Sequence, residues 1–171
     1  MTEGRPLKRK YARIERERRF VLERVPDAVD AEEYTRLIDC FVEGTWLRLR
    51  RLETPDGTEV LTKLGQKIPD PDAPGDVRHR QMTTIYLAPG EATALAELDG
   101  PRSVKRRYKL EEQGHTWAID VWESPPSAAG TILAEVECDS DEELDAIVVP
   151  DWAEREVTDD DAFSAFTLAS S

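Results

Sequence analysis

The fold is decided by one stretch near the N-terminus, Ile14-Glu15-Arg16-Glu17-Arg18-Arg19-Phe20-Val21-Leu22. Side chains of a strand alternate between its two faces, so Glu15, Glu17 and Arg19 would share one face while the other is mainly apolar. Two carboxylates beside a cation can hold a metal ion together with an anionic ligand, because hard divalent cations take oxygen ligands. A solvated edge strand would show the same pattern. The interpretation therefore depends on whether later segments repeat it.

Later segments do repeat the division into one charged and one apolar face. Period-2 alternation, bounded by turn residues such as Pro55-Asp56-Gly57, predicts mostly antiparallel strands. The predicted strands cover residues 11–23, 45–53, 59–66, 77–87, 103–112, 115–123 and 131–139.

The charged faces carry matched groups of one sign on different strands. An ordinary sheet would turn such faces to water. If the sheet closes into a barrel, the charged faces line the lumen and the apolar faces lie outside. Like charges in a lumen repel each other, so each group would need a bound counter-ion. Metal ions would neutralise the carboxylates, and a polyphosphate would neutralise the lysines and arginines.

Helices are predicted between these strands. Asp30 with Glu33 resembles a capping box before apolar residues at helical spacing, which predicts an amphipathic helix ending near Phe41. Further helices are expected after Pro89-Gly90, from Ser140 onward, and over 163–168. We expect one domain over residues 1–171, with about residues 1–10 a disordered N-terminal segment.

The composition of the chain limits the classes of partner that it can bind. The chain has 36 acidic and 23 basic residues and a net charge of −13, which argues against nucleic acid and anionic membranes as partners. With neither a membrane-spanning run nor a signal peptide in the sequence, a cytoplasmic location is expected. Cys40 and Cys138 are interpreted as reduced packing residues, and His79 and His115 as surface residues.

The motifs resemble those of a known family, the CYTH superfamily or triphosphate tunnel metalloenzymes. Residues 15–20 are similar to its ExExK signature, with Arg19 in place of the usual lysine. The resemblance continues through most of the chain, in the family's order. The matching elements are Leu47-Arg48-Leu49-Arg50, Leu61-Thr62-Lys63-Leu64, Lys105-Arg106-Arg107-Tyr108, Trp117-Ala118-Ile119-Asp120-Val121, Ala134-Glu135-Val136-Glu137, and Trp152 followed by Glu156-Val157-Thr158.

This resemblance implies an α+β fold, an eight-stranded antiparallel barrel (the triphosphate tunnel) with helices packed on the outside. It implies hydrolysis of inorganic tripolyphosphate or another small triphosphate by metal-activated water, with Mg²⁺ or Mn²⁺ as cofactor. Glu17, Glu135 and Glu137 would be the catalytic carboxylates. The expected metal ligands are Glu15, Glu17, Asp120, Glu135 and Glu137. The expected phosphate-binding residues are Arg19, Arg48, Arg50, Lys63, Lys105 and Arg107, to which Arg80 adds from the presumed lumen face of its own strand.

Two departures from the family pattern leave alternatives open. Thr84-Ile85-Tyr86 stands where many members carry a second ExE pair, and Ala118 stands where they have a glutamate. Fewer carboxylates could mean that only one metal ion is held tightly, that the substrate differs, that the chemistry is slower, or that the chain is a non-catalytic module that binds polyphosphate or a phosphorylated metabolite. A class IV type adenylate cyclase, which would bind the triphosphate in the same way but attack at the α-phosphorus, is a second enzyme hypothesis. A homodimer through the outer faces of the barrel is also open.

Overall fold

The computed structural model describes residues 9–171, so the first eight residues of the predicted disordered segment lie outside the described residues. Its main strands are β1 (Arg13–Leu22), β2 (Thr35–Phe41), β3 (Leu47–Glu53), β4 (Glu59–Pro69), β5 (His79–Tyr86), β6 (Arg102–Glu112), β7 (His115–Ser124) and β8 (Ile132–Cys138). The remaining elements are α1 (Pro89–Leu95), α2 (Asp141–Ala146), the short strand β9 (Arg155–Glu156), a 3₁₀ turn at Asp161–Phe163 and α3 (Ala165–Ser170).

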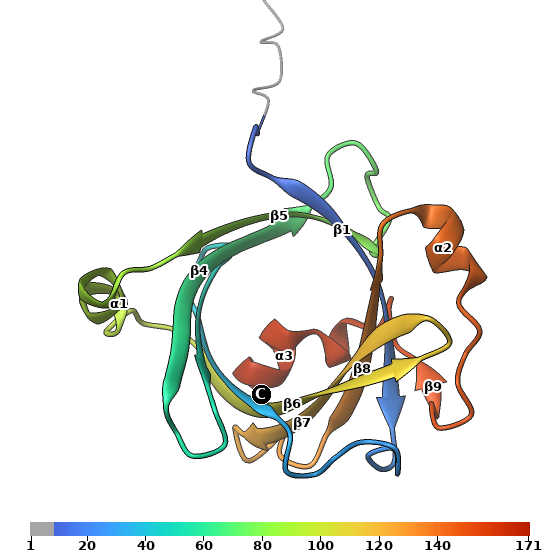
Figure 1. Cartoon of the computed structure of the whole chain (residues 1–171). Coiled ribbons are helices and arrows are strands. Elements are labelled where there is room, and N and C mark those ends of the chain that lie inside the picture. Colours follow the sequence, from blue (N-terminus) through green and yellow to red (C-terminus); the bar gives the residue numbers. More distant parts are fainter. Residues whose placement is uncertain (1–8) are drawn as a thin grey trace, which may run out of the picture.

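The strands β1 to β8 close into a barrel, as Figure 1 shows in a view along its axis. The order around the ring is β1, β5, β4, β3, β2, β6, β7, β8 and back to β1, and every neighbouring pair is antiparallel. The first half of β1 pairs with β5, and β9 pairs with its second half. The expected α+β fold with an eight-stranded antiparallel barrel is confirmed.

Register places the charged faces in the lumen. Residues directly opposite each other in an antiparallel pair point to the same face. Arg50 lies opposite both Asp39 on β2 and Lys63 on β4, while Glu17 lies opposite Glu137 on β8. Continuing this register around the ring brings the charged positions of the separate strands into one interior.

The prediction of a helix from Asp30 to Phe41 is wrong. Asp30 accepts a hydrogen bond from the Glu32 backbone N–H at 2.9 Å within a turn, and Thr35–Phe41 forms β2 between β3 and β6. Both faces of β2 are buried, one in the lumen and one under neighbouring chain, with Leu37 and Cys40 each 2% exposed. A strand buried on both faces loses the alternation that distinguishes strands in a sequence.

An apolar core lies outside the barrel wall. The outer faces of β1, β6, β7 and β8 contribute Phe20, Tyr108, Trp117 and Val136, which are buried against the chain that covers them, including Trp152. The indole of Trp152 packs edge-on against that of Trp117, with ring centroids 5.1 Å apart. Burial of these side chains stabilises the wall from outside, so the charged side chains can face the lumen.

The helices flank the barrel and cross one of its openings. Figure 1 shows α1 and α2 outside the ring and α3 across it. Ala169 of α3 packs with Trp122 and Phe41 at the ends of β7 and β2, so α3 covers that end of the lumen. α2 begins as predicted, with the Ser140 hydroxyl accepting from the Glu143 backbone N–H. None of the helices in residues 9–171 is long and apolar enough to cross a membrane.

Candidate functional site

The lumen gathers charged side chains from every strand of the barrel. All residues that the sequence singled out as metal ligands or phosphate-binding residues lie on lumen-facing positions. Sequence reasoning missed two further residues, Asp39 and Lys67. The lumen cations are Arg19, Arg48, Arg50, Lys63, Lys67, Arg80, Lys105 and Arg107, and the lumen carboxylates are Glu15, Glu17, Asp39, Asp120, Glu135 and Glu137.

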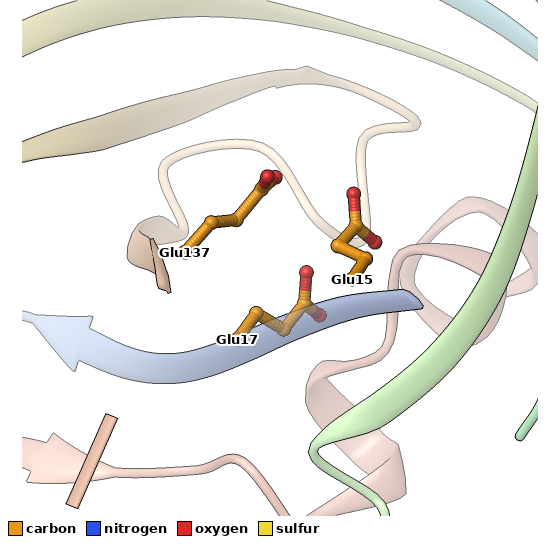
Figure 2. A group of neighbouring side chains, drawn as sticks. All are labelled: Glu15, Glu17 and Glu137. Atoms are coloured by element: carbon orange, nitrogen blue, oxygen red, sulfur yellow. The ribbon is translucent and has the colours of Figure 1, made fainter. Parts of the chain in front are cut away.

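Three of the predicted metal ligands form an acidic cluster, shown in Figure 2. Glu15 and Glu17 project from β1 toward Glu137 of β8, and one carboxylate oxygen of each lies within 4.8 Å of the others. Burial raises the pKa of Glu137 to about 7, and the neighbouring carboxylates Glu15 and Glu17 act in the same direction. The cluster therefore concentrates negative charge that favours a proton or a cation.

Lys67 of β4 reaches this acidic cluster past the intervening strand β5. Its Nζ lies 2.5 Å from Glu15 Oε2 and 2.9 Å from Glu17 Oε2. Burial alone would lower the pKa of Lys67, but the attraction of Glu17 and Glu15 raises it. Lys67 was missed because the predicted strand ended at residue 66, whereas β4 continues to Pro69. Strand alternation places Lys67 on the same lumen face as Lys63, and its pairing with Met82 on β5 agrees.

The other two predicted metal ligands are bound by cations. Arg107 donates to both oxygens of Asp120, at 2.6 and 2.7 Å, and Lys105 also contacts Asp120. Glu135 accepts from Arg19 Nε at 3.2 Å and from Arg107 Nη2 at 3.0 Å. Burial would raise the pKa of Glu135, but Arg19 and Arg107 hold it well below its ordinary value. Asp120 and Glu135 thus act as anchors of the cations in this structure.

Arg50 is held by Asp39, the second residue that sequence reasoning missed. Its Nε and Nη2 each donate to one Asp39 oxygen at 2.7 Å, and Asp39 is 1% exposed. Burial would raise the pKa of Asp39, but Arg50, followed by Arg48, lowers it far below its ordinary value. A two-pronged pair fixes the plane of the guanidinium. Asp39 was missed because β2 was predicted to be helical.

Three lumen cations, Arg48, Lys63 and Arg80, have no acidic partner among residues 9–171. Arg48 lies with its guanidinium 5.9 Å from the centre of the Phe41 ring, and Lys63 projects beside Arg50 on the neighbouring strand. Burial, followed by repulsion from Arg50, lowers the pKa of both Arg48 and Lys63. An anion bound between them would relieve that repulsion. Arg80, by contrast, donates to the carbonyl of His79 at 2.9 Å.

The chemistry of the acidic cluster fits a divalent metal. Glu15, Glu17 and Glu137 offer hard oxygen donors from two adjacent strands, the ligands that Mg²⁺ and Mn²⁺ prefer. Asp120 and Glu135 fit less well, because each of their oxygens already accepts from a guanidinium. The five predicted ligands therefore separate into a cluster of three neighbouring carboxylates, in which Arg19 and Lys67 already contact Glu17, and a pair that anchors arginines.

A cavity of about 450 Å³ opens beside the acidic cluster at the end of the barrel opposite α3. Its lining includes Glu15 and Glu137 together with Ala118 and His115. Ala118 lies directly opposite Glu135 on β8, so the alanine at this position leaves space where a longer side chain would reach into the lumen. A ligand that enters here meets the acidic cluster first and the unpaired cations beyond it.

Two residues outside the lumen have structural contacts. Glu156 of β9 accepts hydrogen bonds from Arg18 Nε and Nη2 at 2.9 and 2.7 Å on the outer side of β1. These bonds hold β9 against β1. His79 was expected at the surface but is 7% exposed, and its Nε2 lies 2.5 Å from Asp141 Oδ1. The surface interpretation of His79 is therefore wrong, because Asp70, Asp76 and Asp141 surround its ring.

Comparison with solved structures finds similar folds, among them two structures of NE1496. The sequence matches no protein-family model and no curated protein. The hypothetical protein NE1496 aligns with a TM-score of 0.59 and 24% identity, over 92% of this chain and 98% of that chain. A structure described as the inorganic triphosphatase NE1496 aligns with a TM-score of 0.59 and 21% identity, over 92% of this chain and 95% of that chain. These alignments and the closed ring of β1 to β8 show that the chain has the triphosphate tunnel fold that its resemblance to the CYTH superfamily implies.

Proposed function

We propose that the chain is a metal-dependent hydrolase of a small triphosphate, such as inorganic tripolyphosphate, which it binds inside the barrel. The observation that carries the proposal is that Arg48 and Lys63, two partly buried cations without an acidic partner in the described residues, share the lumen with the acidic cluster. A triphosphate with a divalent ion supplies the opposite charge to both groups. The similarity to a structure named an inorganic triphosphatase supports this reaction class.

The cations of the lumen would bind and orient the phosphate chain. Arg48 and Lys63 would take phosphate oxygens directly, because they need no prior release from a carboxylate. Arg50, Arg107 and Arg19 are held in fixed orientations by their carboxylate partners and present their remaining N–H groups. Donors that are oriented before substrate arrives cost little reorganisation when charge develops on the reacting phosphate.

Glu15, Glu17 and Glu137 would hold Mg²⁺ or Mn²⁺ at the acidic cluster. When bound, such an ion neutralises phosphate charge and makes a coordinated water more acidic. Glu137 would lie on the open side of the phosphate chain, next to the cavity, where water enters. α3 covers the other end of the lumen and limits entry of water there.

The test is phosphate release from tripolyphosphate, ATP and thiamine triphosphate, with Mg²⁺, Mn²⁺ or EDTA. Wild type should release phosphate only with metal, and Glu17→Gln and Glu135→Gln should each lower kcat at least about a hundredfold. Glu123→Gln is the matched control, because Glu123 pairs with Arg106 on the outer side of β6 and β7. The control should keep wild-type turnover.

Other products would change the assignment. Pyrophosphate and cyclic AMP from ATP would identify a cyclase. Absence of turnover, together with a tripolyphosphate-dependent rise in melting temperature, would identify a binding module. Turnover that survives EDTA would contradict metal dependence.

A further inference from the structure

Lys67 occupies the position in the acidic cluster where a cation is most needed. Its Nζ contacts Glu15 Oε2 at 2.5 Å and Glu17 Oε2 at 2.9 Å, and the other oxygen of Glu17 accepts from Arg19 at 2.7 Å. The side chains of Glu15 and Glu17 are 5% and 7% exposed, so little water screens these contacts. Both oxygens of Glu17 are therefore bonded to cations of the protein itself.

The charge of the cluster fits one further divalent ion. When a bound metal ionises Glu137, the three carboxylates carry −3, and the Lys67 ammonium brings the sum to −2; the charge of Arg19, which also binds Glu135, is counted against Glu135. One Mg²⁺ or Mn²⁺ would neutralise this remainder, whereas a second would leave an excess of +2 at a half-enclosed site. Uncompensated charge in such a site is costly because its solvation by water is reduced.

The rest of the lumen offers no second group of free carboxylates among residues 9–171. The oxygens of Asp120 and Glu135 accept from Arg107 and Arg19, and Asp39 is held by Arg50. Thr84 and Ala118 face the lumen without any carboxylate. A second ion would have to displace an arginine from its partner.

We propose that Lys67 is a fixed internal cation of the metal centre, which limits the centre to a single divalent ion and weakens its affinity for that ion. The inference rests on the proposed function, because it specifies how that function's metal is held. It assigns to one lysine of this chain the part that a second metal ion would otherwise take. Lys67 is thus a positioning residue, which acts through Glu15 and Glu17.

The experiment measures Mn²⁺ binding to the full chain without any phosphate, by electron paramagnetic resonance of the free ion. Wild type should bind one Mn²⁺ per chain. Lys67→Met should bind Mn²⁺ at least about tenfold more tightly, because the competing ammonium is gone, whereas Lys67→Arg keeps the charge and should stay within about threefold of wild type. Lys63→Met is the matched control on the same strand, since Lys63 contacts none of the cluster carboxylates, and it should change the affinity less than Lys67→Met.

Folding is checked by the melting temperature of each variant in EDTA and in Mn²⁺. A Lys67→Met chain that is less stable in EDTA should regain stability in Mn²⁺ more strongly than wild type does. Two ions bound to wild type, or equal affinities of wild type and Lys67→Met, would overturn the inference.

These outcomes are distinguishable from failure of the proposed function. Tight Mn²⁺ binding by Lys67→Met combined with undetectable binding by wild type would support the role of Lys67 while refuting metal-dependent hydrolysis by the natural chain. If wild type binds one Mn²⁺ and the variants respond as expected, but no phosphate is released, the inference about the metal centre would be supported and the proposed hydrolase function would be refuted.

Discussion

Asp39 and Arg50 show how single residues prepare the lumen for an anion. An arginine side chain has many conformations in water, and ordering it on binding costs entropy. The two hydrogen bonds from Arg50 to Asp39, each 2.7 Å, fix the guanidinium before any ligand arrives. The same device recurs where Arg107 meets Asp120. Carboxylates in this lumen thus serve the phosphate site by holding its arginines.

Loss of Asp39 should be costly for stability. Asp39→Ala would leave Arg50 buried at 6% exposure without its counter-ion, so we expect a loss of about 3–5 kcal/mol in the free energy of unfolding. Urea denaturation at pH 7 measures it. The double variant with Arg50→Met should recover part of the loss, because no buried charge then remains unpaired. A loss below about 1 kcal/mol for the single variant would contradict this account.

Arg48 should contribute binding rather than stability. Because it lacks an acidic partner within residues 9–171, Arg48→Met should not destabilise the chain and should weaken tripolyphosphate binding about tenfold or more, as expected for loss of a charged hydrogen bond. Isothermal titration with tripolyphosphate measures the affinity.

Arg51→Met is the matched control for Arg48, because Arg51 lies on the same strand, faces outward and pairs with Glu53. It should leave the affinity for tripolyphosphate unchanged. Equal losses in Arg48→Met and Arg51→Met would indicate a nonspecific effect of charge rather than a site in the lumen.

At the scale of elements, β2 marks the limit of what the sequence predicted. Seven strands, the two helices after Pro89 and Ser140, and the helix expected over 163–168, observed as α3, could be located from turn residues and clear patterns. The eighth strand was mistaken for a helix, since Asp39 is buried in the lumen and Cys40 on the opposite face. Only pairing with β3 and β6, contacts distant in sequence, makes this segment a strand.

For the site, the sequence predicted which residues face the lumen but not which residues pair with each other. Charged residues at alternate positions identified the lumen face of most strands. Their partners could not be read from the sequence, because each ion pair joins different strands. That is why Asp120 and Glu135 were predicted as metal ligands although they hold arginines in this structure. Lys67 was missed because the predicted strand ended at residue 66, whereas β4 continues to Pro69.

The connection from α1 to β6 depends on Gly100. Its φ of +146° is unfavourable for other residues, and an added Cβ would lie 1.8 Å from the carbonyl oxygen of Phe41 at the end of β2. Gly100→Ala should therefore lower the free energy of unfolding by about 2–4 kcal/mol. Gly90→Ala, at an open position in α1, is the control and should change it by less than about 1 kcal/mol. Urea denaturation compares the two, and similar effects would refute the steric argument.

At the scale of the whole molecule, the lumen and the rest of the chain differ in charge. The chain carries a net charge of −13, yet lumen cations outnumber lumen carboxylates. The excess of negative charge therefore lies outside the lumen, where it keeps nonspecific polyanions away. Binding of an anion is restricted to a ligand small enough to enter the barrel.

The acidic cluster also links the stability of the whole molecule to pH. Burial, Glu15 and Glu17 raise the pKa of Glu137 to about 7, whereas an unfolded glutamate titrates near 4.3. The folded chain then binds this proton more tightly than the unfolded chain, so its contribution is present at low pH and is lost as pH rises toward 7. Asp39 and Glu135 have lowered pKa values, and their contributions vary only at more acidic pH.

Glu137→Gln should remove this dependence on pH. In EDTA, the free energy of unfolding of wild type should fall between pH 5 and pH 8 relative to that of Glu137→Gln, which keeps a neutral side chain throughout. The two proteins should be closest at pH 5, and the variant should be the more stable one at pH 8. Urea denaturation across this range measures the difference, with Glu123→Gln as a control that follows wild type. Parallel curves for wild type and Glu137→Gln would mean that Glu137 is ionised throughout, and that Lys67 alone balances the cluster in the absence of metal.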